Sequence, residues 1–129
     1  MKMNYKIAAA LIGSFVLGAG AASVYAQTHA PSYTVGLINV KDENGYKNDF
    51  LPKAQETIKK YGGVYIAGGF NKTTVLSGNP PPNRVVILKF DSLDTVKKWN
   101  EGGGMKVQEE VGNKYADFQT FAVEGVEQK

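Results

Sequence analysis

The sequence contains no cysteine and a single histidine, His29, and these absences exclude several kinds of chemistry. Without cysteine there is no disulfide framework, no thiolate metal site and no cysteine nucleophile. One histidine cannot form a multi-histidine metal site within one chain. His29 precedes Pro31 in a short polar stretch, where we expect a solvated side chain. A histidine that activates a serine or ligates a haem is therefore not expected in the folded part of the chain.

Extremes of composition are absent as well. Of the 129 residues, 43% are hydrophobic, 21% charged and 11% aromatic, which excludes a disordered, collagen-like or coiled-coil chain. The length allows one domain. Adjacent acidic pairs, such as Glu109 with Glu110, point to different sides of a helix and do not predict a metal site. We expect no metal and no other cofactor.

Residues 1–26 have the pattern of a secretory signal peptide. Lys2 and Lys6 form a basic start, residues 7–22 are apolar, and a Val-x-Ala ending precedes Gln27. The alternative is a retained membrane anchor, because residues 7–26 carry no charge and are just long enough to span a bilayer. The alanine and glycine content of this stretch favours cleavage. We therefore expect a periplasmic or secreted protein without a membrane partner after cleavage.

The charge balance gives no reason to expect a nucleic acid as a partner. The formal net charge is +3, and the signal segment contains two of the lysines and no acidic residue, so the remaining chain is close to neutral. The glycine run at residues 102–104 precedes Met105 and Lys106, and it lacks the spacing of a phosphate-binding P-loop. This run predicts a flexible connection between helices.

Residues 33–125 are expected to form one domain, between a flexible lead at 27–32 and a tail at 126–129. Asp42 and Ser92 are candidate N-caps, and the pair Gly62-Gly63 is a candidate C-cap. Gly68-Gly69 predicts a bulge or bend, followed by a second extended stretch at 73–76 and a proline-rich loop at 77–83. Strands are predicted at 33–40, 64–67, 84–90 and 117–123, and helices at 42–61, 93–101 and 105–114.

The element order β-α-β-β-α-β is that of a ferredoxin-like α+β fold, an antiparallel four-stranded sheet with the helices on one face. Because side chains alternate along a strand, Val86, Leu88 and Phe90 are expected to face the helices. The other face then carries Val35, Leu37, Val85 and Ile87, and it is too apolar to meet water alone. We expect a second copy of the chain to cover it, sheet on sheet.

A series of short motifs resembles the family known as domain of unknown function 1330. The resemblance covers residues 33–125 and implies a protomer of the dimeric α/β-barrel superfamily, in which two sheets close into a barrel across a homodimer. The family has no assigned reaction, so the resemblance implies a fold and no catalytic residue. The motifs that carry it are Tyr33–Val40 with Asp42 and Tyr46, Tyr61-Gly62-Gly63, Gly68-Gly69, Arg84–Phe90, Ser92, Trp99 and Phe121–Gly125.

Five residues are candidates for binding a small molecule in such a barrel. Lys89 points away from the helices, and a desolvated lysine could act as a base or hold an anion. Asn39 is expected on the same face, with Tyr46 and Tyr65 near the cavity mouth and Trp99 in its wall. The alternative is that Lys89 reaches solvent and pairs with a carboxylate, while Tyr46 and Trp99 are core residues.

Two functions remain open. The first is binding or transformation of a small metabolite in the barrel cavity without a metal. The second is a non-catalytic dimeric protein of the periplasm, whose sheet face serves assembly alone. The size of the cavity distinguishes them, because a packed interior favours assembly and an open one favours a ligand. The sequence does not identify a substrate or a reaction, and it does not decide whether the protein is an enzyme.

Overall fold

A single antiparallel sheet has the strand order β2-β3-β1-β4, so the two most buried strands, β1 and β3, lie at its centre. The computed structural model describes residues 30–126, and the predicted signal peptide at 1–26 lies outside the described residues. The strands are β1 (Ser32–Val40), β2 (Val64–Phe70), β3 (Arg84–Phe90) and β4 (Ala116–Glu124). The predicted α+β, ferredoxin-like order is confirmed, and the sheet of one chain stays open.

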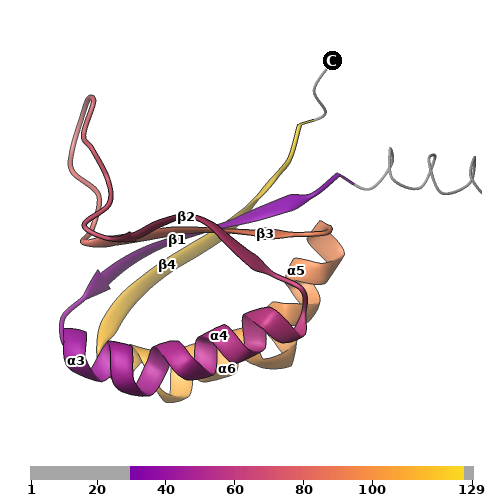
Figure 1. Ribbon diagram of the computed structural model, residues 1–129, viewed down its shortest axis with the longest axis horizontal. Helices are drawn as coiled ribbons and strands as arrows, with labels where there is room; N and C mark the ends of the chain where they lie inside the picture. The colour runs from indigo at the N-terminus through magenta and orange to yellow at the C-terminus, as the bar shows by residue number, and fades with distance from the viewer. Residues whose placement is uncertain (1–29, 127–129) are drawn as a thin grey trace, which may run out of the picture. The chain divides into compact units, whose positions relative to one another are not determined.

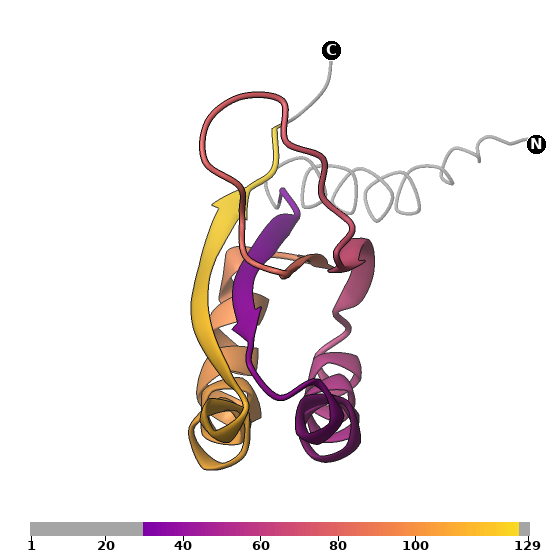
Figure 2. The ribbon, with the colours of Figure 1, turned by 90° about the vertical axis from the view of Figure 1, so that its left-hand side faces the viewer.

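All helices lie on one face of this sheet (Figure 1). The first helical segment comprises α3 (Glu43–Gly45), a π-helical turn at residues 46–50 and α4 (Leu51–Lys60). The second comprises α5 (Leu93–Trp99), a π-helical turn at 100–104, α6 (Met105–Glu110) and a 3₁₀ turn at 112–114. Figure 2 shows the two segments side by side beneath the strands. Within residues 30–126, no helix has both the length and the apolar character that a membrane crossing requires.

The helix boundaries follow from local sequence. The Asp42 carboxylate accepts a hydrogen bond from the backbone N–H of Gly45 at 3.0 Å, and the Ser92 hydroxyl accepts one from Thr95 N–H at 3.2 Å. Both predicted N-caps are thereby confirmed. Pro52 lies in the first turn of α4, directly after the π-helical turn at residues 46–50.

The second strand is longer than predicted. β2 runs through Gly68-Gly69 to Phe70, which pairs with Arg84, and its register shifts between Tyr65 and Ala67. Chain beyond Phe70 passes the end of β3 and finds no strand to pair with. For that reason the extended stretch predicted at 73–76 is not a strand, and residues 71–83 form the long loop in Figures 1 and 2.

The glycine run at 102–104 interrupts the helix, as predicted. Gly103 has non-helical backbone angles, and the kink there separates α5 from α6. Side chains here would collide with the neighbours, because a Cβ on Gly102 would overlap the Tyr61 hydroxyl and a Cβ on Gly104 would lie 2.8 Å from the Trp99 ring. The run therefore serves close packing of this turn against Tyr61 and Trp99.

Side chains alternate between the helix-facing side and the open face along the central strands, as predicted. Val86, Leu88 and Phe90 are buried against the helices, whereas Val85 and Ile87 are half-buried on the open face. The buried apolar side chains form two separate clusters, one around Tyr46 and Phe50 and one around Ile58, Leu88, Phe90 and Val96.

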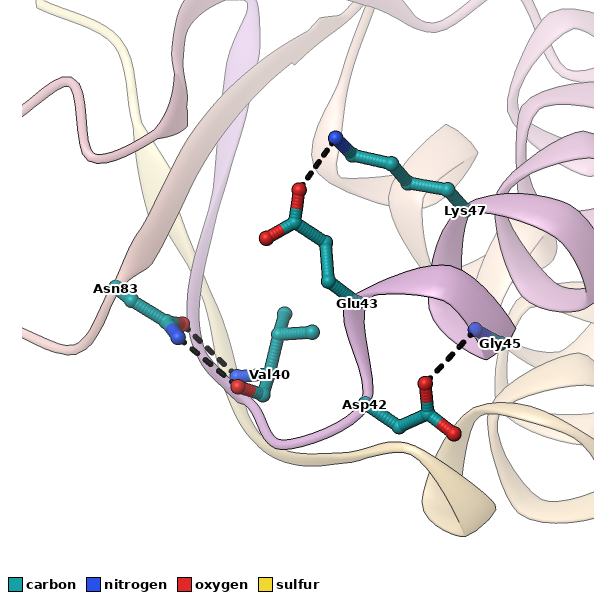
Figure 3. A network of polar contacts seen from close by, with 6 residues as sticks. All are labelled: Val40, Asp42, Glu43, Gly45, Lys47 and Asn83. Atoms are coloured by element: carbon teal, nitrogen blue, oxygen red, sulfur yellow. Dashed lines mark hydrogen bonds and ion pairs between the residues drawn. The ribbon is translucent and has the colours of Figure 1, made fainter.

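A side chain joins the end of β1 to the beginning of β3. The backbone N–H of Val40 donates to the Asn83 side-chain oxygen at 2.9 Å, and the Asn83 amide donates to the Val40 carbonyl at 2.9 Å (Figure 3). The Asn83 amide thus supplies the donor and acceptor that a strand residue would supply from its backbone. This pairing fixes the position of the next residue, Arg84.

Replacing Asn83 with alanine should lower the free energy of unfolding by about 2 kcal/mol, because both hydrogen bonds are lost and two backbone groups of Val40 lose their partner. Urea denaturation followed by circular dichroism measures the change. The matched control is Asn113→Ala, at an exposed position, which should change stability by less than about 0.5 kcal/mol. Equal effects of the two substitutions would contradict this role of Asn83.

Candidate functional site

A cavity of about 480 Å³ lies between the sheet and the helices. All four strands contribute to one wall, and α4, α5, α6 and the two π-helical turns contribute to the other. Residues of both core clusters line it. The cavity therefore lies between the two clusters and separates them. Most lining side chains are aliphatic or aromatic, with a small number of polar groups among them.

The most unusual polar group is the guanidinium of Arg84. Arg84 is only 7% exposed, and its Nε donates a hydrogen bond to the Tyr46 hydroxyl at 3.1 Å. Its Cζ atom lies 4.7 Å from the centroid of the Phe70 ring and 5.5 Å from that of Tyr46. The two ring centroids are 5.8 Å apart, so the guanidinium lies beside a pair of contacting rings and is held by cation–π attraction as well as by its hydrogen bond. The side chain is therefore fixed in the cavity wall.

Two tyrosines accompany Arg84. Burial raises the pKa of Tyr46 above its ordinary value, and the charge of Arg84 and its hydrogen bond offset part of this rise. Burial likewise raises the pKa of Tyr65, again against the lowering effect of Arg84. Both phenols are therefore neutral at neutral pH. They act as hydrogen-bonding groups here and not as bases or counterions.

The wall opposite the sheet contains Trp99. Its indole Nε1 donates to the Thr57 hydroxyl of α4 at 3.1 Å, and its ring lies 5.2 Å from that of Phe90. This hydrogen bond joins the two helical segments across the cavity. Lys97 and Glu101 also line the cavity, and both are exposed to solvent.

Small residues form the floor on the sheet. Gly36 of β1 pairs with Thr120 of β4, and both line the cavity. Two positions before Gly36, Thr34 is 3% exposed, and its hydroxyl has no hydrogen-bond partner among the described residues. A Cβ on Gly36 would lie 3.1 Å from Val86 Cγ2 and 3.4 Å from Ile38 Cδ1, so these two side chains cover the glycine at the centre of the sheet.

The structure places three of the five predicted site residues on this cavity and two elsewhere. Tyr46, Tyr65 and Trp99 line it. Lys89 and Asn39 are exposed and lie on the other face of the sheet, as alternation along β3 and β1 requires. Within one chain, the structure therefore brings Tyr46, Tyr65 and Trp99 together and leaves Lys89 and Asn39 on the open face.

Two residues of the cavity were missed by the sequence analysis. Arg84 has the same parity as Val86, Leu88 and Phe90, and Thr34 has the same parity as Gly36, Ile38 and Val40. The alternation that identified the buried face therefore also places an arginine and a threonine on it. A charged residue in phase with a buried strand face is the signal that could have identified Arg84.

Acidic residues do not gather around the cavity. Within residues 30–126, no group of three or more His, Cys, Asp or Glu side chains is placed to hold a metal ion. The described part of the chain has two ion pairs, Lys41 with Asp117 and Lys47 with Glu43, and both lie at the surface. The Lys47–Glu43 pair is drawn beside the N-cap of Asp42 in Figure 3.

Two solved structures of one protein show the same fold at low sequence identity. RPA0582, a protein of unknown function from Rhodopseudomonas palustris, has a TM-score of 0.58 at 11% identity, over 82% of this chain and 94% of that one. Its methylated form gives 0.59 at 12% identity, over 81% and 91%. An EthD-like protein from Ralstonia eutropha gives 0.49 at 13% identity, over 75% and 91%.

No curated protein matches the sequence. A family model does match the sequence, and the match covers nearly every residue of the fold and of the cavity described above. The model of one family matches residues 31–126, a span that begins just before β1 and ends just after β4. The chain therefore belongs to the family described as domain of unknown function 1330 (DUF1330).

Proposed function

We propose that the protein binds a small, mostly apolar organic molecule between its sheet and its helices, without a metal cofactor. The observation that carries this proposal is the cavity of about 480 Å³. Sites for small ligands are typically concave, have volumes of about 300–1,000 Å³ and combine an apolar lining with a few polar groups. A domain whose helices packed fully against the sheet would leave no such space.

Filling the cavity tests the proposal. Thr120→Trp adds an indole to a residue of β4 that lines the cavity and pairs with Gly36 of β1. The probe is N-phenyl-1-naphthylamine, an uncharged molecule whose fluorescence rises in apolar surroundings. We expect the unmodified protein to bind it and Thr120→Trp to weaken binding at least tenfold.

Asn113→Trp, which adds the same side chain at an exposed position outside the cavity, is the matched control and should leave probe binding unchanged. Binding that survives Thr120→Trp would place the probe outside the cavity and contradict the proposal. Failure of the unmodified protein to bind the probe would contradict it as well.

The open face of the sheet supports a second part of the proposal, a homodimer. Val35, Leu37, Val85 and Ile87 are half-buried in the single chain, and Phe121 and Val123 of β4 are exposed beside them. An apolar face of this extent in one protomer fits an isologous contact with a second copy. A dimer that bound no molecule in its cavities would have assembly as its function, and the probe experiment distinguishes this case.

A further inference from the structure

We propose that the ligand is a small organic monoanion, a carboxylate on an aromatic or branched aliphatic body, and that Arg84 binds its charged end. This inference rests on the proposed function, because it specifies the chemistry of a ligand in the same cavity. It is carried by the surroundings of Arg84, by the protonation of the neighbouring tyrosines and by a second buried polar group.

The guanidinium of Arg84 is a buried charge without a counterion. Among residues 30–126 it forms no ion pair, and the described acidic partners of other cations lie at the surface. A buried charge is costly unless it is paired and hydrogen-bonded. Tyr46 and Tyr65 offer hydrogen bonds, yet both are neutral at neutral pH and do not supply the missing negative charge.

The geometry around Arg84 prepares the group for a planar anion. One nitrogen, Nε, is committed to the Tyr46 hydroxyl, and the ring of Phe70 lies against the guanidinium plane. These contacts hold the plane in place and leave its other edge without an acidic partner. Carboxylates bind such an edge through two parallel hydrogen bonds, which gives arginine its preference for them.

A second polar group lies further along the sheet. The Thr34 hydroxyl is buried in the cavity wall without a hydrogen-bond partner among the described residues, and a buried polar group in that state calls for one. Ser32 has a similar hydroxyl but does not line the cavity. Arg84 pairs with Ile38, four positions from Thr34 on β1, which is about 13 Å along the strand.

The spacing between these groups gives the ligand a length. A molecule that reaches both has its carboxylate at Arg84, an apolar body along the apolar lining and a hydrogen-bonding group near Thr34. The lining is mainly apolar, and its charged residues other than Arg84, which are Lys97 and Glu101, are exposed to solvent. A short polar anion such as acetate would fill only the Arg84 end of the cavity.

Two matched probes test the inference. 4-tert-Butylbenzoate and 4-tert-butylbenzamide have the same apolar body and differ in charge. Isothermal titration of the protein purified from cells that express the full chain should show the carboxylate binding at least tenfold tighter than the amide. Arg84→Met keeps the side-chain length and removes the charge, and it should reduce this preference to about one by weakening the carboxylate alone.

Lys89→Met removes the same charge from the opposite face of β3 and should leave the preference intact. If Arg84→Met does not fold, Arg84→Lys retains a charge without the planar fork and should keep a reduced preference for the carboxylate. Equal binding of the two probes by the unmodified protein, or loss of the preference in Lys89→Met, would overturn the inference. The proposed function would then still stand on the uncharged probe.

Discussion

Replacing Gly68 with alanine is expected to lower the free energy of unfolding by roughly 3 kcal/mol or more, one of the largest effects of a single methyl group in this chain. Gly68 has a φ of +101°, which L-residues rarely adopt, and a Cβ there would overlap the carbonyl oxygen of Val85. The overlapped atom belongs to the backbone of a central strand. The overlap can therefore be removed only if β2 moves away from β3.

Urea denaturation measures the effect, with Gly62→Ala as the matched control. Gly62 also has a positive φ, +76°, but nothing lies within 4 Å of the point that a Cβ would occupy, so alanine there should cost only the conformational penalty of about 1 kcal/mol. The difference between the two variants isolates the overlap. A cost at Gly68 no greater than that at Gly62 would show that β2 can shift freely.

The second large effect is expected at the proposed dimer contact. Ile87 lies in the centre of the open face, paired with Val35 of β1 and Ala67 of β2. Ile87→Asp would place a carboxylate in a desolvated contact, at a cost of several kcal/mol. A loss of about 3 kcal/mol raises a dissociation constant more than a hundredfold, which converts a micromolar dimer into a monomer at ordinary concentrations.

Sedimentation velocity reports the oligomeric state, and circular dichroism shows that the variant is folded. Leu76→Asp is the matched control, because Leu76 is 93% exposed in the loop between β2 and β3 and lies outside the sheet. It should leave the dimer intact. A monomer for the unmodified protein would contradict the homodimer, whereas a dimer that survives Ile87→Asp would place the contact elsewhere.

The parts of this fold that sequence reasoning predicted are those with local causes. Asp42 and Ser92 cap helices through hydrogen bonds that span three residues, and the alternation along β1 and β3 follows from the pleat of a strand. The strand order follows from the same elements, because β-α-β-β-α-β has few compact arrangements.

What sequence reasoning missed depends on distant neighbours. β2 continues past Gly68-Gly69 because β3 offers partners as far as Arg84, and the glycine run at 102–104 lies close against Tyr61 and Trp99. Neither neighbour is visible from the local pattern. The cavity depends in turn on how far two helical segments stand from the sheet, which no periodicity encodes.

For the site as well, sequence reasoning predicted the features with local causes and missed those that depend on distant neighbours. Alternation correctly placed Lys89 away from the helices, and it held the information that Arg84 faces them. The expectation of a closed dimer favoured the lysine as the enclosed cation. The structure shows an enclosed cation within one chain, beside Tyr46 and Phe70, where side chains from β2 and the first helical segment meet β3.

The position of Trp99, which its hydrogen bond to Thr57 holds in the cavity wall, has a practical consequence. Trp99 is the only tryptophan in the sequence, and it lines the cavity. Intrinsic emission excited in the indole band therefore reports from a single known position, and its wavelength depends on the polarity around that ring. The protein thus carries its own optical label in the wall where a bound molecule would displace water, and occupancy can be followed without a dye.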